Sequence, residues 1–264
     1  MRLNKYISHN TTYSRREADK LIKDGFVKVN HKVVKEPYYD VEKDDKVFLK
    51  GRLIKVKRGF TVIVYNKPKG ELVTKKDDRG RRTIYDSLGS KFRHFIPIGR
   101  LDFATEGLLL LTDSPKVAQV LMESNLERIY KVKIKGSITP AIEKAMKEGL
   151  ELEDATKGAH KDSKIKSMVF APFYAYQIIK NDPKYSKLKI ALSEGQNREI
   201  RRFFAHFNRE VVDLKRLEFG GVALNALPVG KTRYLTKKEY DDLKEFLKNQ
   251  KKEKNEDSKS KNKP

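Results

Sequence analysis

An aspartate with unusual neighbours is the first residue that suggests chemistry. Asp102 lies in segment 98–112, Ile-Gly-Arg-Leu-Asp-Phe-Ala-Thr-Glu-Gly-Leu-Leu-Leu-Leu-Thr, two positions after Arg100 and shortly before a run of leucines. A carboxylate among apolar residues is partly withdrawn from water, and it stays ionised only if a cation or several hydrogen-bond donors compensate. The segment therefore predicts either a paired, reactive carboxylate or a turn aspartate that accepts backbone N–H groups.

A second segment supplies cations. Residues 194–207 contain three arginines and an apolar stripe at i, i+3, i+4 and i+7 spacing, made of Ile200, Phe203, Phe204 and Phe207. At about 100° per residue, Arg201 lies beside this stripe, whereas Arg198 and Arg202 lie at about 160° and 200° from Ile200. We therefore expect Arg201 to point along the interior toward a buried anion. Arg198 and Arg202 should point outward, where phosphates would bind.

Other kinds of chemistry lack their residues. The chain has no cysteine, and its five histidines show no pair at metal-ligand spacing. It also contains neither of the glycine motifs that cradle nucleotide phosphates, nor the G-x-S-x-G elbow of serine hydrolases. We therefore expect no metal and no nucleotide cofactor.

The charge balance points to a polyanionic partner. Of 264 residues, 59 are Lys or Arg and 36 are Asp or Glu, which gives a formal net charge of +23. An excess of this size favours nucleic acid over a membrane surface. No apolar run approaches the roughly 18 residues that span a bilayer. Since the first five residues also lack the apolar core of a signal peptide, the sequence predicts a cytoplasmic protein with no membrane partner.

Residues 1–50 have the pattern of a small module with one helix and short strands. Ser14 and Glu17 form a capping box that starts a helix, and Gly25 follows its expected end near Asp24. Short alternating strands are predicted at 26–29 and 47–49. The helix has one basic face, made of Arg16, Lys20 and Lys23. This face suits a phosphate backbone, although an ordinary solvated helix face has the same pattern.

The rest of the chain divides into a basic linker (51–59), a β-rich domain (60–247) and a Lys-rich tail (248–264). The predicted strands are 60–65, 107–112, 129–134, 168–178, 188–192 and 214–219. The predicted helices are 140–148, 197–207 and one from the capping box at 236–239 to about Lys248. Without regular βαβ spacing, this order predicts an α+β fold with a mostly antiparallel mixed sheet and flanking helices. The tail contains no apolar residue and is predicted to be disordered.

Taken together, these segments resemble the bacterial ribosomal RNA pseudouridine synthases of the RsuA type, and most closely the large-subunit members. In the N-terminal module, 2–7 and 14–19 resemble the S4 RNA-binding domain of that family. In the following domain the matching segments are 66–70, 78–86, 99–112, 130–132 and 194–203, in the family's order and spacing. The resemblance covers residues 1–245, and its most specific motif is the one around Asp102. Glu199 departs from it, since the family more often has Gln there, and this puts the contact at that position in doubt.

The resemblance implies an activity and a set of catalytic residues. These enzymes break the glycosidic N–C bond of a uridine within RNA, turn the base and form a C–C bond. Asp102 matches their indispensable aspartate, which could attack the base, attack the ribose or act through a glycal. Arg201 matches the cation that pairs with this aspartate. Tyr130 matches a tyrosine that stacks on the target ring and helps to move a proton, although a lone strand tyrosine is commonly only a buried one.

The resemblance also implies how RNA is bound. Because the target atoms lie inside stacked RNA, the uridine must be flipped out, and Arg100 is the nearest candidate to fill the gap or to bind an adjacent phosphate. The complete set of predicted RNA-binding residues is Arg100, Arg198, Arg202, Arg15, Arg16, Lys20 and Lys23.

We therefore expect a monomeric, cofactor-free enzyme that isomerises a uridine in ribosomal RNA, of the large subunit (23S), as free RNA or in a pre-ribosomal particle. The alternatives are a 16S rRNA synthase and a non-catalytic RNA- or ribosome-binding factor that retained the fold. The presence of Asp102, Tyr130 and Arg201 together favours the enzyme, because a pure RNA binder would gain nothing from a carboxylate that repels phosphate.

Overall fold

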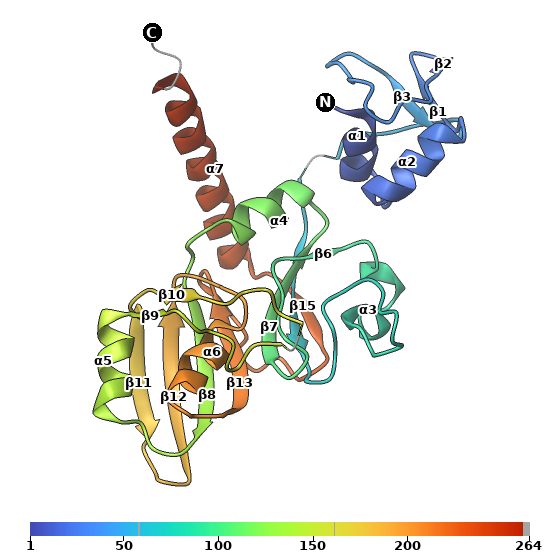
Figure 1. The fold of residues 1–264 in the computed structure, drawn as a ribbon. Helices are drawn as coiled ribbons and strands as arrows, with labels where there is room; N and C mark the ends of the chain where they lie inside the picture. The colour runs from blue at the N-terminus through green and yellow to red at the C-terminus, as the bar shows by residue number, and fades with distance from the viewer. Residues whose placement is uncertain (58, 161, 261–264) are drawn as a thin grey trace.

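The N-terminal module consists of two helices packed on a small sheet. The computed structural model describes residues 1–57, 59–160 and 162–260. The helices are α1 (Leu3–Asn10) and α2 (Arg15–Lys23), and the strands are β1 (Val27–Val29), β2 (Lys32–Val33), β3 (Val47–Leu49) and β4 (Arg52–Leu53) (Figure 1). The capping box of α2 is present, because Ser14 and Glu17 each accept the backbone N–H of the other through their side chains. Gly25 follows the helix with a φ of 79°, as its position predicts.

The module extends beyond residue 50, so the predicted start of the linker is wrong. Lys50 and Gly51 both have positive φ angles, 48° and 77°, which is the geometry of a tight hairpin turn. The chain therefore doubles back, and β4 pairs with β3. Ile54 is buried in the core of the module, next to residues of both helices. The connection to the next domain thus begins only after Ile54.

The second domain is built on one large mixed sheet, as the sequence predicts. Its strands follow the order β11-β12-β8-β13-β7-β5-β15, with β14 paired to β13 and β6 paired to β7. Their bounds are β5 Val62–Lys67, β6 Ile96–Pro97, β7 Glu106–Thr112, β8 Arg128–Lys135, β11 Ala175–Lys180, β12 Tyr185–Leu192, β13 Val211–Phe219, β14 Val222–Ala223 and β15 Thr232–Tyr234. Within the described residues, β13 and β7 form the one parallel pair of this sheet.

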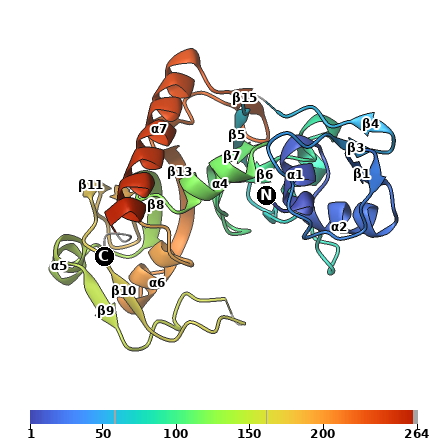
Figure 2. The ribbon, with the colours of Figure 1, turned by 90° about the horizontal axis from the view of Figure 1, so that it is seen from above.

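Helices cover the sheet in three separate groups. Helices α5 (Pro140–Glu148) and α6 (Glu199–His206) share an apolar core with β8, β12 and β13. Helices α4 (Pro115–Met122) and α7 (Lys237–Ser260) share another core with β5 and β7, while α3 (Ile84–Ser87) packs on residues of the same strands in a third cluster. The N-terminal module lies beside the β5–β7 half and away from β11 and β12 (Figures 1 and 2).

The two halves of the sheet meet where β7 runs beside β13. Gly107 of β7 has a φ of 105°, and a Cβ atom there would lie 2.2 Å from the carbonyl oxygen of Arg216. Any side chain at this position would therefore push the two strands apart, so glycine is required by the close approach. The turn that carries Asp102 leads directly into β7, which places it at this junction.

Three segments differ from their predictions. The strand predicted at 168–178 is two strands in different sheets, because β10 (Met168–Phe170) pairs with β9 (Leu150–Leu152), whereas β11 joins the large sheet. Helix α4 was not predicted at all, although Ser114 caps it and Pro115 occupies its first turn. The predicted disorder from residue 248 is wrong up to Ser260, where α7 ends. Lys and Glu favour helices, and an existing helix is extended at little cost. Residues 261–264 lie outside the described part of the chain.

Of the helices in the described ranges, none combines the length and the apolar character that crossing a bilayer requires.

Candidate active site

A buried lysine donates hydrogen bonds to the turn that carries Asp102. Lys67, at the end of β5, has no exposed surface, and its Nζ donates to the carbonyl oxygens of Pro68 (2.9 Å), Asp102 (3.2 Å) and Thr105 (2.9 Å). Burial lowers the pKa of Lys67 to about 8, against the opposing effect of Glu71, Asp102 and Glu106. Sequence reasoning placed Lys67 in a turn motif without a role. Its position at the end of an apolar strand was the signal that it would be buried.

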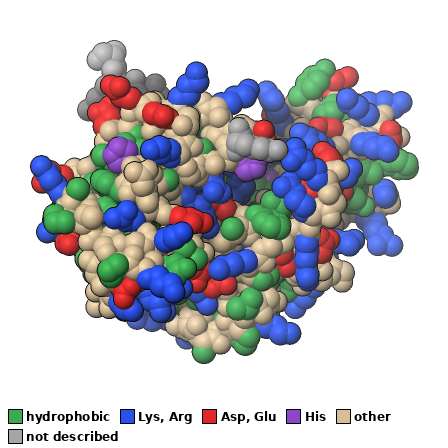
Figure 3. Space-filling model, turned by 60° about the horizontal axis from the view of Figure 1, so that its bottom comes forward, with side chains coloured by type: hydrophobic (Ala, Val, Ile, Leu, Met, Phe, Trp, Pro, Cys, Tyr) green, Lys and Arg blue, Asp and Glu red, His purple; other side chains and the backbone are tan. Residues whose placement is uncertain are grey.

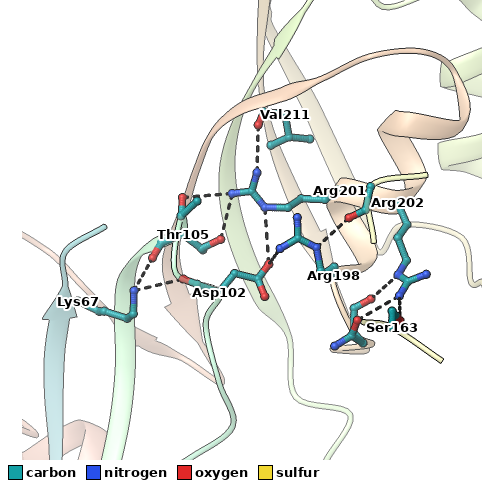
Figure 4. Close-up of polar contacts among 11 residues, drawn as sticks. Lys67, Asp102, Thr105, Ser163, Arg198, Arg201, Arg202 and Val211 are labelled. Carbon is teal, nitrogen blue, oxygen red and sulfur yellow. Dashed lines mark hydrogen bonds and ion pairs between the residues drawn. The ribbon is translucent and has the colours of Figure 1, made fainter. Parts of the chain in front are cut away.

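Two arginines from the start of α6 contact the carboxylate of Asp102. Arg198 Nη1 lies 3.2 Å and Arg201 Nε 3.6 Å from the same oxygen, Oδ2. Figure 4 shows the Asp102 side chain directed toward these two guanidinium groups, with Lys67 on the opposite side of the turn. The other carboxylate oxygen, Oδ1, makes no hydrogen bond within the described residues, and the side chain remains 31% exposed. The arrangement therefore presents a carboxylate with one oxygen near two cations and the other oxygen available.

Arg201 is tied into both halves of the sheet. Its Nη1 donates to the carbonyl oxygen of Val211 at the start of β13 (3.1 Å). Its Nη2 donates to the carbonyl oxygen of Ala104 (3.2 Å) and to Thr105 Oγ1 (3.3 Å), both in the Asp102 turn. Burial and the nearby Arg198 lower the pKa of Arg201, whereas Asp102 and Asp213 raise it. The predicted pairing of Arg201 with Asp102 is thus present in the structure.

Arg198 does not point outward, contrary to the prediction. Helix α6 begins at Glu199, and Arg198 precedes it in the left-handed conformation, with φ 52° and ψ 28°. The helical phase used in the prediction does not apply to a residue with this backbone. Its Nε donates to the carbonyl oxygen of Gly158 (2.8 Å), which directs the rest of the guanidinium to Asp102. Arg198 is therefore a residue of the Asp102 site and lies nearer to its carboxylate than Arg201.

Arg202 is also not at the surface, and the prediction that it binds RNA is wrong. Its side chain is fully buried and donates to the carbonyl oxygens of Ala155 and Ile165, to Ser163 Oγ and to Asn197. The face of α6 that helical phase assigns to solvent is covered by the segment that connects β9 with β10. Arg202 thus holds this segment against α6 through Ala155, Ser163 and Ile165.

Tyr130 lies on β8 of the sheet and takes part in none of these contacts. It is buried on β8, opposite Arg216 of β13 and Ile190 of β12, and it packs in the core that includes α6. Among the described residues, Tyr130 makes no hydrogen bond or ion pair with Asp102, Arg198 or Arg201. β13 separates β8 from β7, the strand that follows the Asp102 turn.

Glu199 is buried beside another arginine and not in the Asp102 pair. Its Oε2 accepts the backbone N–H of Gln196 at 3.0 Å. Burial, against the opposing effect of the Gln196 hydrogen bond and with a further contribution from Glu194, raises the pKa of Glu199 to about 7, while Arg128 lowers it. The contact in doubt at this position is therefore an interaction with the loop that precedes α6.

The remaining predicted RNA-binding residues are exposed. Arg100 lies two residues before Asp102, and Arg15, Arg16, Lys20 and Lys23 lie along α2 in the N-terminal module. Figure 3 shows Lys and Arg side chains distributed over the whole displayed face of the molecule. A cavity of about 410 Å³ adjoins the site and is lined by Gly158, Arg198, Arg201, Ala205, Asn208, Arg209, Glu210 and Val211. No group of three or more potential metal ligands occurs in the part of the chain that the structure describes.

Comparison with known proteins identifies the family. Residues 61–206 match the model of RNA pseudouridylate synthase, and residues 1–47 match the S4 domain. A Helicobacter pylori (strain J99) protein named as an uncharacterized RNA pseudouridine synthase is 55% identical over 251 residues, which cover 94% of this chain and 95% of that protein. Ribosomal large subunit pseudouridine synthase B of Bacillus subtilis is 34% identical over 89% of this chain and 92% of its own length.

A solved structure supports the same assignment. The crystal structure of a pseudouridylate synthase superposes with a TM-score of 0.62 at 26% sequence identity, and the match covers 92% of this chain and 99% of that one. The fold and the site thus define an S4-containing RNA-modifying enzyme. The chain belongs to the RNA pseudouridine synthase family.

Proposed function

We propose that this enzyme isomerises a uridine of large-subunit (23S) ribosomal RNA to pseudouridine, with Asp102 as the essential catalytic group. The observation that carries the proposal is the Asp102 carboxylate: two arginines form ion pairs with one of its oxygens, while the other oxygen has no polar partner among the described residues. The relative named ribosomal large subunit pseudouridine synthase B supports the choice of RNA.

The arrangement suits each of the routes by which the carboxylate could act. Attack on the base, attack on the ribose and a route through a glycal all need an ionised carboxylate close to the sugar. Arg198 and Arg201 stabilise that ionised form and fix its orientation, while Oδ1 approaches the nucleotide. Isomerisation is redox-neutral overall: the C1′–N1 bond breaks, a C1′–C5 bond forms, and the proton that leaves C5 is balanced by one gained at N1, so the reaction needs no oxidant or group donor.

Tyr130 and the basic residues complete the proposal. Tyr130 would contact the target ring from β8, and Arg100 would bind RNA at the mouth of the site. The exposed basic residues of α2 would supply affinity at a distance, because phosphate contacts position RNA without any part in the chemistry. The enzyme would act in the cytoplasm as a monomer, on ribosomal RNA or a pre-ribosomal particle.

The experiment is a comparison of pseudouridines in 23S and 16S rRNA from cells with and without this gene, by carbodiimide labelling and primer extension. We expect one stop in 23S rRNA to disappear with the gene, to return with the wild-type gene and to stay absent with Asp102→Asn. Loss of a stop in 16S rRNA would move the target to the small subunit. Unchanged patterns in both RNAs would refute a ribosomal RNA substrate.

A further inference from the structure

An exposed phenyl ring follows Asp102 directly in the chain. Phe103 is 43% exposed, whereas most phenylalanines of the second domain are buried in its cores. Its ring makes no aromatic or cation–π contact with any described residue. The ring of Phe103 is therefore open to solvent one residue after Asp102 in the chain, where a ligand at that site can reach it.

The backbone carbonyl groups of the turn that carries this ring are all hydrogen-bonded. The four consecutive carbonyl oxygens of residues 102–105 all accept hydrogen bonds from other parts of the chain. Lys67 donates to the first and the last, the backbone N–H of Gly70 donates to that of Phe103 (2.8 Å), and Arg201 donates to that of Ala104 (3.2 Å). The Cα of Phe103 is thus fixed relative to Asp102 before any ligand binds. Binding through this ring therefore orders only two side-chain torsions.

The surroundings of the ring suit RNA. Arg100 lies three residues before Phe103 and is exposed. The turn that holds the Phe103 carbonyl contains Lys69, whose Nζ forms an ion pair with Asp213 at 2.6 Å and is itself about half exposed. An aromatic ring flanked by cations is the arrangement that binds single-stranded or unstacked nucleotides, because the ring stacks on a base while the cations contact phosphates.

Resting on the proposed function, we infer that Phe103 stacks on the nucleobase next to the target uridine when that uridine is flipped out. Flipping exposes a face of the neighbouring base that was stacked on the uridine. A ring held one residue from the reacting carboxylate can cover that face, as apolar side chains do in other unstacked nucleic acids. Flipping uncovers one base face on each side of the vacated position, so Phe103 covers one face and leaves the other to Arg100. Arg100 makes no hydrogen bond or ion pair within the described residues, so its long side chain is free to reach a phosphate.

The experiment compares Phe103→Ala and Phe103→Trp with the wild type and with Tyr174→Ala, which removes an aromatic ring 73% exposed outside the site. The RNA is a synthetic hairpin that holds the mapped uridine, made intact or without the base on the 5′ or the 3′ side of it. Single-turnover rates at saturating enzyme are measured on each. A second set of hairpins carries 2-aminopurine in place of the flanking base, so that its fluorescence reports stacking in the absence of turnover.

On intact RNA, Phe103→Ala should slow isomerisation about 5- to 100-fold, which is the effect of losing one base–aromatic stack. Phe103→Trp and Tyr174→Ala should stay near the wild-type rate. On the hairpin that lacks the stacked base, the wild type and Phe103→Ala should react at similar, reduced rates. The quenching of 2-aminopurine at that position should be weaker with Phe103→Ala.

Two results would overturn the inference. The first is an unchanged rate and unchanged quenching for Phe103→Ala on intact RNA. The second is a loss of rate that persists in full on both hairpins without a flanking base, since this would show that Phe103 acts on the fold of the turn. In either case an active wild type leaves the proposed function standing. That function fails separately if the wild type forms no pseudouridine in the hairpin.

Discussion

The two arginines at Asp102 should contribute similarly to the reaction but differently to stability. Arg198 and Arg201 contact the same carboxylate oxygen at 3.2 and 3.6 Å. Since Coulomb energy falls as the inverse of distance, their attractions to Asp102 differ by only about a tenth. Arg198→Ala and Arg201→Ala should therefore slow the chemical step by similar factors.

The size of the effect follows from the contacts that are lost. Both contacts are ion pairs without a hydrogen bond, and at a partly exposed carboxylate such a pair contributes about 1 kcal/mol. This corresponds to a rate about 5-fold lower for each single variant. The double variant should lose more than the product of the single effects, because each arginine partly compensates for loss of the other.

The two alanine variants should differ in their thermal stability. Arg201→Ala also removes the hydrogen bonds to Val211, Ala104 and Thr105, whereas Arg198→Ala removes one bond to Gly158. A loss of about 2 kcal/mol would lower the Tm of a chain of this size by roughly 4–8 °C for Arg201→Ala. The decrease for Arg198→Ala should be about half as large or less.

The assay is single-turnover pseudouridine formation at saturating enzyme, with thermal unfolding of the same preparations. Lys187→Ala is the control, since Lys187 is exposed on β12, two strands away from β13 in the sheet. If Arg198→Ala reacts as fast as the wild type once RNA is saturating, its contact with Asp102 is not part of the chemistry. A fall only in RNA affinity would restore the role that helical phase predicted.

Three further predictions concern other parts of the chain. Arg202→Met should lower the Tm and speed amide hydrogen exchange in the segment between β9 and β10, and the salt dependence of RNA binding should not change. A changed slope of log K against log salt at constant Tm would contradict the buried position of Arg202. Because burial raises the pKa of Glu199 from 4.5 to about 7, the folded protein binds a proton between these pH values that the unfolded chain has lost, and stability falls as the pH rises through this range. Glu199→Gln should therefore raise the free energy of unfolding above pH 7 by up to about 3 kcal/mol, measured by chemical denaturation, and should have no such effect below pH 4. Equal effects at both pH values would refute the raised pKa of Glu199. Replacing Arg16, Lys20 and Lys23 by Gln should weaken RNA binding and reduce the slope of log K against log salt by about 0.7–0.9 per lost phosphate contact, at an unchanged saturated rate, whereas an unchanged slope would place the RNA contact elsewhere.

Local signals in the sequence predicted the elements that depend on local contacts. Helix α5 has the predicted bounds because Thr139 caps it, Pro140 begins it and Gly149 ends it with a positive φ. The capping box of α2 is present for the same reason. The division of 168–178 between two sheets depends on strand partners far away in the sequence, so alternation alone could not indicate it.

The site shows the same limit at the level of single residues. The motif around Asp102 and the position of Arg201 beside the apolar stripe led to a contact that the structure contains. Arg198 was misplaced because the residues next to it in the sequence do not predict a left-handed backbone before the helix. Arg202 was misplaced because the residues that cover it, Ala155, Ser163 and Ile165, lie 37 to 47 positions earlier in the chain. Helical phase predicts which way a side chain points, but not what packs against it.

The most direct test of the central claim is Asp102→Asn in tritium release from RNA that carries 5-tritiated uridine. Asn keeps the shape of the side chain and removes the charge that the two arginines hold. We expect no release above background at saturating enzyme, with a Tm close to that of the wild type and RNA affinity equal or slightly higher, because a negative charge next to phosphates is gone. Release at a rate comparable with the wild type would show that the Asp102 carboxylate is not the catalytic group.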